Sequence, residues 1–275
     1  MSAAKQRQDM KQLLLIIGVL LLSGCQHLFE YHPYDARFTG AKNINRQNIG
    51  RIEKNCRDKD TIRVAFISDS HGWFSDLKRA VSSVNKQEKV DFVVHLGDLT
   101  DCGTTREYER TRDLLQDLRV PYIAMIGNHD YLGTGDEVFD VMFGGMDFSF
   151  IAGRVKFICL NTNATEYDYI AAVPNFDFME EEITAHNDDF DATVVCMHAC
   201  PYSDQFNNNV AKAFNHYMTL FKNLHFAACG HGHSFEINDI YNNGIIYYMA
   251  DSVSHGSYLL FTITPTDYAY ELIHF

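Results

Sequence analysis

The amino-acid sequence predicts an α/β fold for this chain of 275 residues. Short apolar runs of the buried-strand type alternate with segments of helical periodicity. A polar cluster follows directly after each of five such runs. The composition agrees, because 46% hydrophobic and 13% aromatic residues suit a globular chain with a substantial core.

Five apolar runs have the length and composition of buried strands. They are Arg63–Ser68, Asp91–Leu96, Pro121–Ile126, Ala192–Cys196 and Phe226–Cys229. In open α/β sheets, ligands bind beyond the carboxyl ends of the strands. Polar clusters at five strand ends can therefore converge on one crevice.

The segments between these runs predict further helices and strands. Apolar residues at helical spacing predict helices over Asn45–Asn55, Ser75–Val84, Thr105–Leu118 and Met179–His186. Phe148–Ala152 and Val155–Asn161 predict a hairpin that turns at Gly153. Three closing strands are predicted at Gly244–Met249, Ser257–Thr264 and Tyr268–His274.

The five polar clusters carry the residue types of a two-metal hydrolytic centre. In chain order they are Asp69-Ser-His71, Gly97-Asp98-Leu-Thr-Asp101, Gly127-Asn128-His129-Asp130, Met197-His198 and Gly230-His231-Gly232-His233. Two divalent ions held close together need carboxylate, imidazole and amide-oxygen ligands, with at least one carboxylate to bridge them. Such a pair, about 3.5 to 4 Å apart, holds both the attacking and the leaving oxygen of an in-line displacement.

Taken together, the clusters resemble the calcineurin-like metallophosphoesterase superfamily. Its pattern is D-x-H, G-D-x-x-D, G-N-H-[DE], a lone His and G-H-x-H, and all five parts occur here in that order. The resemblance covers approximately residues 61–275 and implies two packed mixed β-sheets flanked by helices. It also implies a metal-dependent hydrolase of phosphate monoesters or diesters that uses a dinuclear centre and metal-activated hydroxide.

The resemblance gives each matching residue a role. Asp98 would bridge two ions, held on one side by Asp69, His71 and His233 and on the other by Asn128, His198 and His231. His129 would be the general acid for the leaving oxygen, and the carboxylate of Asp101 would orient its imidazole. Asp130 would support the site from behind the ligands. Manganese, iron, zinc, nickel and magnesium all remain open, because mixed nitrogen and oxygen sites accept several ions.

Two departures from the pattern narrow the class of enzyme. Cys102 stands where related protein serine/threonine phosphatases carry a phosphate-gripping arginine, and Thr100 and Asp101 stand where purple acid phosphatases have a tyrosine ligand. Compact phosphatases and phosphodiesterases therefore remain as the expected class. The alternative is a membrane-tethered binding lipoprotein with a structural or degraded metal site.

The N-terminus resembles the signal peptide of a bacterial lipoprotein. Basic residues precede the apolar stretch Leu13–Leu22, which is too short for an ordinary membrane-spanning helix, and a Leu-Ser-Gly-Cys tetrad ends at Cys25. We expect residues 1–24 to be removed, Cys25 to be acylated, residues 25–60 to form an attachment arm and lead-in segment, and residues 61–275 to form the domain. Gln26 after the cysteine favours the outer membrane of the cell envelope. An uncleaved anchor or a simple secretory signal remains open.

Charge and cysteine usage add two expectations. The chain has 23 basic and 36 acidic side chains, and the loss of residues 1–24 leaves 20 against 35, a net charge of −15. Such an acidic surface argues against a nucleic-acid polymer as partner, and the oligomeric state stays open. Cys159, Cys196 and Cys229 lie in apolar runs where free cysteine packs as a small hydrophobe, so no essential disulfide is expected.

Overall fold

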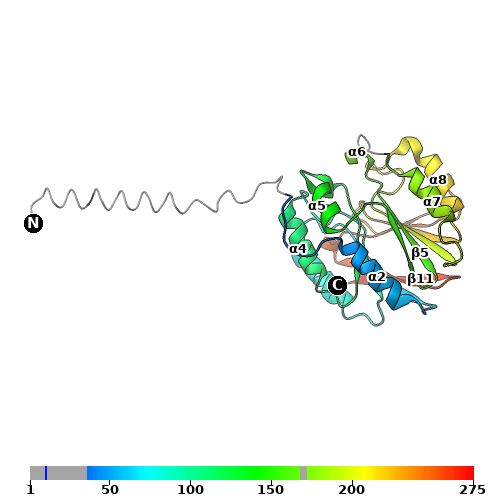
Figure 1. The fold of residues 1–275 in the computed structure, drawn as a ribbon, viewed down its shortest axis with the longest axis horizontal. Coiled ribbons are helices and arrows are strands. Elements are labelled where there is room, and N and C mark those ends of the chain that lie inside the picture. Colours follow the sequence, from blue (N-terminus) through cyan, green and yellow to red (C-terminus); the bar gives the residue numbers. More distant parts are fainter. Residues whose placement is uncertain (1–9, 11–35, 168–171) are drawn as a thin grey trace, which may run out of the picture. The chain divides into compact units, whose positions relative to one another are not determined.

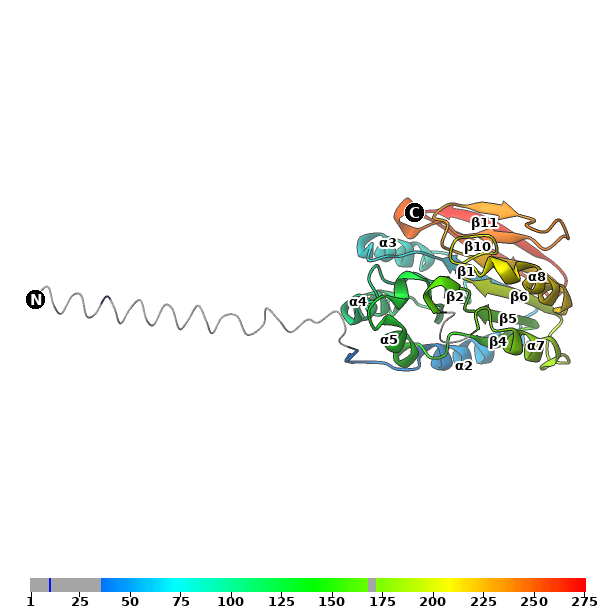
Figure 2. The same ribbon diagram turned by 90° about the horizontal axis from the view of Figure 1, so that it is seen from above.

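The computed structural model of the protein describes Met10, residues 36–167 and residues 172–275. Residues Ala36–Phe275 form one compact unit in which two β-sheets pack face to face with helices outside them (Figures 1 and 2). The expected α/β fold with two mixed sheets is therefore confirmed. Apart from Met10, the predicted signal peptide lies outside the described residues, and so does Cys25.

The first sheet has five strands in the order β11-β10-β1-β2-β3. Their bounds are β1 Ile62–Ile67, β2 Phe92–His95, β3 Tyr122–Ala124, β10 Ser257–Ile263 and β11 Tyr268–His274. Strands β1, β2 and β3 run parallel, whereas β10 is antiparallel to both β1 and β11. The three parallel strands thus end at the same edge of the sheet.

The second sheet has six strands in the order β4-β5-β6-β7-β9-β8. Their bounds are β4 Phe148–Ala152, β5 Val155–Leu160, β6 Ala192–Met197, β7 Leu224–Cys229, β8 Glu236–Asn238 and β9 Tyr247–Met249. The central strands β5, β6, β7 and β9 are parallel, and the antiparallel strands β4 and β8 form the two edges. Residues on β5 and β6 are buried throughout, as expected for parallel strands covered on both faces.

Aromatic side chains fill the space between the sheets. The rings of Phe226 and Phe261 stack at 4.3 Å, and Phe66 meets Phe261 edge to face at 5.4 Å. All three are completely buried. This core joins β1 and β10 of the first sheet to β7 of the second and so fixes the distance between the polar ends of their strands.

Helices cover the outer face of each sheet. Their bounds are α3 Phe74–Val84, α4 Thr105–Leu115 and α5 Gly135–Met142 on the first sheet, and α7 Phe176–Thr184 and α8 Ala211–Leu220 on the second (Figure 2). Shorter elements are α6 Ala164–Tyr167 and 3₁₀ turns at His129–Tyr131, Asn208–Val210 and Val253–His255. Helix α4 begins at a capping box in which Thr104 and Glu107 satisfy each other's backbone amides. No helix among the described residues is long and apolar enough to cross a membrane.

Helix α2, Ile44–Cys56, packs on the edge strands β3 and β4. The Asn45 side chain donates to the carbonyl of Ala124 at 2.7 Å and accepts from its amide at 2.9 Å. The Asn48 side chain donates to the carbonyl of Tyr122 at 2.8 Å. These side chains take the place of a neighbouring strand, so the segment before the domain covers an open sheet edge.

The predicted elements agree with the structure in type, and the differences lie mainly at their ends. The helix expected at Met179–His186 occupies Phe176–Thr184, because the side chain of Asn175 accepts from the Phe178 amide and begins the helix earlier. Helices α5 and α8 and the short strand β8 were not predicted.

Candidate metal centre

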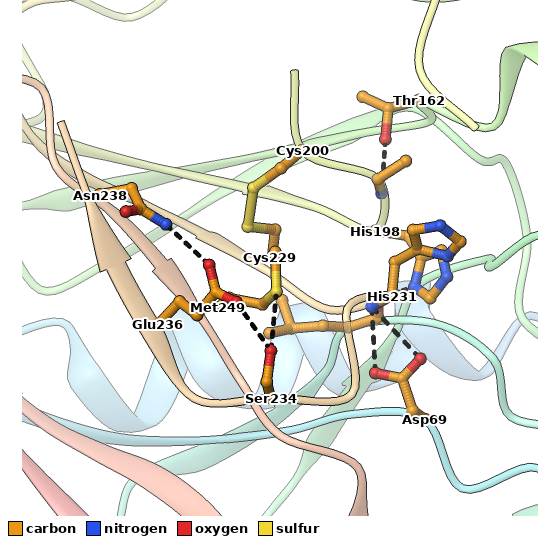
Figure 3. The surroundings of a disulfide bond; sticks show 12 residues. Asp69, Thr162, His198, Cys200, Cys229, His231, Ser234, Glu236, Asn238 and Met249 are labelled. Atoms are coloured by element: carbon orange, nitrogen blue, oxygen red, sulfur yellow. Dashed lines mark hydrogen bonds between the residues drawn. A yellow bond between two sulfur atoms is a disulfide. The ribbon is translucent and has the colours of Figure 1, made fainter. Parts of the chain in front are cut away.

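The strand ends bring all five polar clusters to one place. In the first sheet, β1, β2 and β3 lead into the clusters of Asp69, Asp98 and Asn128, and in the second sheet β6 and β7 lead into those of His198 and His231. Figure 3 shows His198, His231 and Asp69 close together. The structure therefore gathers the seven residues expected to bind metal.

Three of these residues form a first group. Nε2 of His71 lies 2.9 Å from Nε2 of His233, and Oδ1 of Asp69 lies 3.3 Å from the same His233 atom. Two ligand atoms about 2.1 Å from one ion, at right angles to each other, are about 3 Å apart. The spacing of the group thus fits a single ion.

Asn128, His198 and His231 form the second group. Oδ1 of Asn128 lies 3.1 Å from Nε2 of His198 and 3.0 Å from Nδ1 of His231. Nδ1 of His198 lies 2.8 Å from the carbonyl of Leu96, which leaves Nε2 as the nitrogen that faces the group. A hydrogen bond at the remote nitrogen is the usual way in which a protein fixes the tautomer of a metal-binding histidine.

Asp98 lies between the two groups. Its Oδ2 is 3.3 Å from Nε2 of His71 and 3.3 Å from Nε2 of His198, and it accepts no hydrogen bond from the described residues. The side chain is 1% exposed. A buried carboxylate oxygen without a donor is costly, and a cation between the groups would remove that cost. The donor set and this atom together fit a pair of divalent ions.

The local charges favour ionised carboxylates. Burial raises the pKa of Asp69, but the neighbouring imidazoles of His233 and His71, at 3.3 and 3.6 Å, outweigh this effect and hold the pKa below its ordinary value. Burial acts on Asp98 in the same sense, and the neighbouring His198 again lowers its pKa overall. Both groups are therefore anionic at neutral pH, as metal ligands must be.

The backbone is strained at the candidate ligands. Five of the seven have a left-handed φ, namely Asp69 at 53°, His71 at 38°, Asp98 at 54°, His231 at 70° and His233 at 48°. This conformation is uncommon for residues other than glycine and clusters at functional sites. Neighbouring glycines allow the close approach, since a Cβ at Gly97 would lie 2.5 Å from Nδ1 of His198.

His129 stands beside the first group. Its ring meets that of His71 edge to face at 4.5 Å, and its side chain is 38% exposed. Nδ1 lies 2.8 Å from the main-chain carbonyl of Asp101, whereas the Asp101 carboxylate is 3.7 Å away. The sequence led us to expect the carboxylate as the partner, and it lies within ion-pair distance, but the hydrogen bond itself is made by the carbonyl.

Asp130 connects the loop of Asp98 to the loop of Asn128 through hydrogen bonds to the backbone. Its carboxylate accepts from the amides of Leu99, Thr100 and Gly127 and from the Thr100 hydroxyl, at 2.8 to 3.1 Å. Burial, together with the nearby Asp98, raises the pKa of Asp130 to about 6. Its position agrees with the supporting role expected for it, because its carboxylate is bonded to both the Asp98 loop and the Asn128 loop.

His95 and the cysteines complete the surroundings. His95 is fully buried and bonded to the Ser70 hydroxyl at 2.9 Å, and burial lowers its pKa to about 4. No essential disulfide was expected and whether any forms was left open, and the structure has one, between Cys200 and Cys229 (Figure 3). Cys159 and Cys196 are free and buried, as expected. The bridge joins the loop after His198 to the strand before His231.

Sequence reasoning missed Asp204. Its Oδ1 lies 2.6 Å from Nε2 of His231, the ring nitrogen on the side away from Asn128, and this contact lowers the pKa of Asp204. No motif marks this carboxylate, which lies in an irregular loop after β6. Only the three-dimensional contact reveals it.

Known proteins resemble this chain in sequence and in fold. A 3′,5′-cyclic-nucleotide phosphodiesterase of Nostoc sp. is 27% identical over 143 residues, which are 51% of this chain and 52% of that protein. The chain thus spans about half the length of this relative. Two solved structures share the fold. Purple acid phosphatase PPD1 from yellow lupin has a TM-score of 0.59 at 14% identity, covering 79% of this chain and 52% of that one. A dimetal phosphatase from Danio rerio has a TM-score of 0.53 at 11% identity, covering 76% and 98%.

The family match covers the part of the chain that carries the candidate metal centre. It extends over residues 62–235, from β1 to the residues just after His233. Members of this family typically bind two metal ions, and the groups described above supply the histidines and aspartates for them. By this match, the chain belongs to the calcineurin-like phosphoesterase family.

Proposed function

We propose that this protein is a hydrolase of small organic phosphodiesters that works with two divalent metal ions. The observation that carries the proposal is Oδ2 of Asp98, which is buried, accepts no hydrogen bond from the described residues and lies 3.3 Å from a histidine of each group. An oxygen in this position has the geometry of a bridging ligand. Asp69, His71 and His233 would complete one ion site, and Asn128, His198 and His231 the other.

The bound ions would supply Lewis acidity toward the phosphate oxygens and a water acidic enough to attack phosphorus at neutral pH. The protein's own contribution is to hold the ligands in place. His198 is fixed through the Leu96 carbonyl, and both oxygens of Asp69 accept from the His231 amide at 3.1 to 3.2 Å. Main-chain bonds of this kind set the ligand positions before substrate arrives.

We propose that His129 donates a proton to the departing oxygen. Its Nδ1 donates to the Asp101 carbonyl, so the acid would be the imidazolium, which gives the proton on Nε2 and returns to the neutral ring with its proton on Nδ1. The ring lies against His71 and is partly open to solvent, where a leaving group could reach it. General acid catalysis typically contributes about 10² to 10⁴ in rate. Asp101 would act through its carbonyl as the group that positions His129.

The preference for diesters is supported by the relative. The Nostoc protein is named as a cyclic-nucleotide phosphodiesterase, and its similarity to this chain includes about half of each sequence. A 3′,5′-cyclic nucleotide is a small diester of the class that a two-metal site could accept. We therefore extend the proposal to cyclic nucleotides as the first substrates to try.

The test compares monoester and diester turnover by the same preparation. The metal-loaded protein is assayed with p-nitrophenyl phosphate, bis-p-nitrophenyl phosphate and 3′,5′-cyclic AMP, with manganese present or removed by chelation. We expect manganese-dependent hydrolysis of the two diesters at a higher kcat/KM than the monoester. A preparation that binds manganese but cleaves only the monoester would overturn the diester assignment, and one that cleaves nothing would overturn the proposal.

We also propose that Cys25 carries lipid and anchors the protein in the bacterial cell envelope. The lipobox-like tetrad supports this, and so does the Cys200–Cys229 bridge, because disulfides persist in exported proteins and are rare in the cytosol. Cells fed a labelled fatty acid should label the wild type but not Cys25→Ala. Labelling of both proteins, or of neither, would contradict the anchor.

A further inference from the structure

We propose that Asp204 positions His231 as a metal ligand, and that the Cys200–Cys229 disulfide anchors the loop that presents Asp204. The inference rests on the proposed two-metal centre and adds to it a residue outside the family pattern. The geometry carries it, because Asp204 and Asn128 approach opposite nitrogens of one imidazole, at 2.6 and 3.0 Å.

The two ring nitrogens of His231 have different surroundings. Nδ1 faces Asn128 and the second ligand group, and Nε2 faces the Asp204 carboxylate. A neutral imidazole carries one proton, and it binds metal through the other nitrogen. An anionic acceptor at Nε2 holds the proton there, which leaves the lone pair on Nδ1 for the ion and makes it a better donor.

The contact requires an ordered loop, because the Asp204 side chain is 82% exposed and an exposed pair contributes little by charge alone. Several bonds order the loop between β6 and α8. The Tyr202 amide donates to Oδ1 of Asn208, whose Nδ2 donates to the Ser203 carbonyl, each at 2.8 Å. The Gln205 carbonyl accepts from the Ala164 amide at 2.9 Å. Phe206, beyond Asp204, is buried against Phe214 of α8.

The disulfide ties the start of this loop to the strand that presents His231. Cys200 lies two residues after His198, and Cys229 lies two residues before His231. Figure 3 shows the bridge beside both histidines. One covalent link therefore joins the segment that leads to Asp204 with the strand that leads to His231, which limits how far the start of the loop can move from that strand.

The experiment measures metal affinity rather than activity. Metal-free wild type, Asp204→Asn and Asp204→Ala are titrated with manganese by calorimetry, and the two binding steps are resolved. We expect Asp204→Asn to weaken one step by about 10-fold and Asp204→Ala by up to about 100-fold, because Asn keeps an acceptor but not the charge. The other step, at Asp69, His71 and His233, should be unchanged and serves as a check on folding.

Asp189→Asn is the matched control. Asp189 also contacts a surface histidine, because its Oδ2 lies 3.4 Å from Nδ1 of His186. Neither residue belongs to the groups of candidate ligands. This variant should bind both ions as the wild type does. Equal affinities in the wild type and both Asp204 variants would overturn the inference while leaving the two-metal centre intact. A wild type that binds no manganese would overturn the centre itself.

The anchoring part has its own variant, Cys200→Ser with Cys229→Ser. We expect this double variant to lose affinity in the same binding step as Asp204→Asn, and to lose little more when Asp204→Asn is added. Undiminished affinity, with the first ion bound normally, would show that the loop holds Asp204 without the bridge and would overturn the anchoring role.

Discussion

The main-chain amide of His129 donates a 2.9 Å hydrogen bond to Oδ1 of Asp98. The two oxygens of the Asp98 carboxylate therefore have different surroundings. Oδ1 accepts from the backbone, and Oδ2 faces the two groups of candidate ligands. The same bond links His129, the proposed acid, to Asp98, the proposed bridging ligand, so the position of one residue depends on the other.

Asp98→Asn should lose metal as well as turnover. The amide can still accept from the His129 backbone, but it cannot offer an anionic oxygen to two cations. We expect the metal content after dialysis to fall from two ions to one or fewer per chain, with kcat down at least about 100-fold. Elemental analysis of the purified variant is the measurement. Two ions per chain in a folded variant would refute the bridge.

His129→Ala should keep its metals and lose rate in a way that depends on the leaving group. Esters with poor leaving groups need a proton and should slow by about 10² to 10⁴, whereas p-nitrophenyl esters should slow much less. Steady-state rates for methyl and p-nitrophenyl esters of the same phosphate, at matched metal content, provide the comparison. Equal losses for both would remove His129 from the acid role.

Asn45→Ala should destabilise the fold without touching the metal centre. The change leaves the amide and carbonyl of Ala124 without partners at a buried sheet edge, which costs about 2 to 4 kcal/mol of the free energy of unfolding. Chemical denaturation measures this. Arg46→Ala, an exposed position on the same helix, is the control and should change stability by less than about 0.5 kcal/mol. A similar effect from both variants would mean that the helix, not the side-chain bonds, matters.

Asp147→Asn should stabilise the protein at neutral pH but not in acid. Burial raises the pKa of Asp147 from 3.8 to about 6, although the Asn161 amide bonded to it acts in the opposite sense. The folded state therefore binds this proton more tightly than the unfolded state does, so stability falls as pH rises from about 4 to about 6. Asn avoids that loss, worth up to about 3 kcal/mol above pH 6. Unfolding curves at pH 4 and pH 7.5 should show a difference between the proteins only at the higher pH.

The ligand groups could be predicted from the sequence because buried strands and the polar residues after them are local signals. Asp69, Asp98 and Asn128 each follow a run of apolar residues, and parallel strands necessarily end at one edge. The missed elements have weak local signals. Helix α8 lacks a side-chain cap at Val210, and the exposed strand β8 is three residues long, so neither shows a clear start or pattern.

Contacts between distant loops could not be predicted in this way. Cys200 and Cys229 are 29 residues apart, and Cys229 ends an apolar strand in which a free cysteine would pack equally well. Asp204 has no motif, and its contact with His231 exists only because the ends of β6 and β7 are adjacent. The hydrogen bond from His129 to the Asp101 carbonyl could not be predicted either, because every residue has a carbonyl and the sequence does not show which one is used.

The left-handed backbone at five ligand positions has a consequence for the history of such proteins. Each of these conformations costs on the order of 1 kcal/mol in a residue other than glycine, so the fold holds several kcal/mol of strain, part of which the proposed cations would offset. A lineage that stopped using ions would gain stability by accepting glycine at positions 69, 71, 98, 231 and 233. Glycine at these positions in a related protein would therefore indicate that it keeps the fold but no longer binds metal.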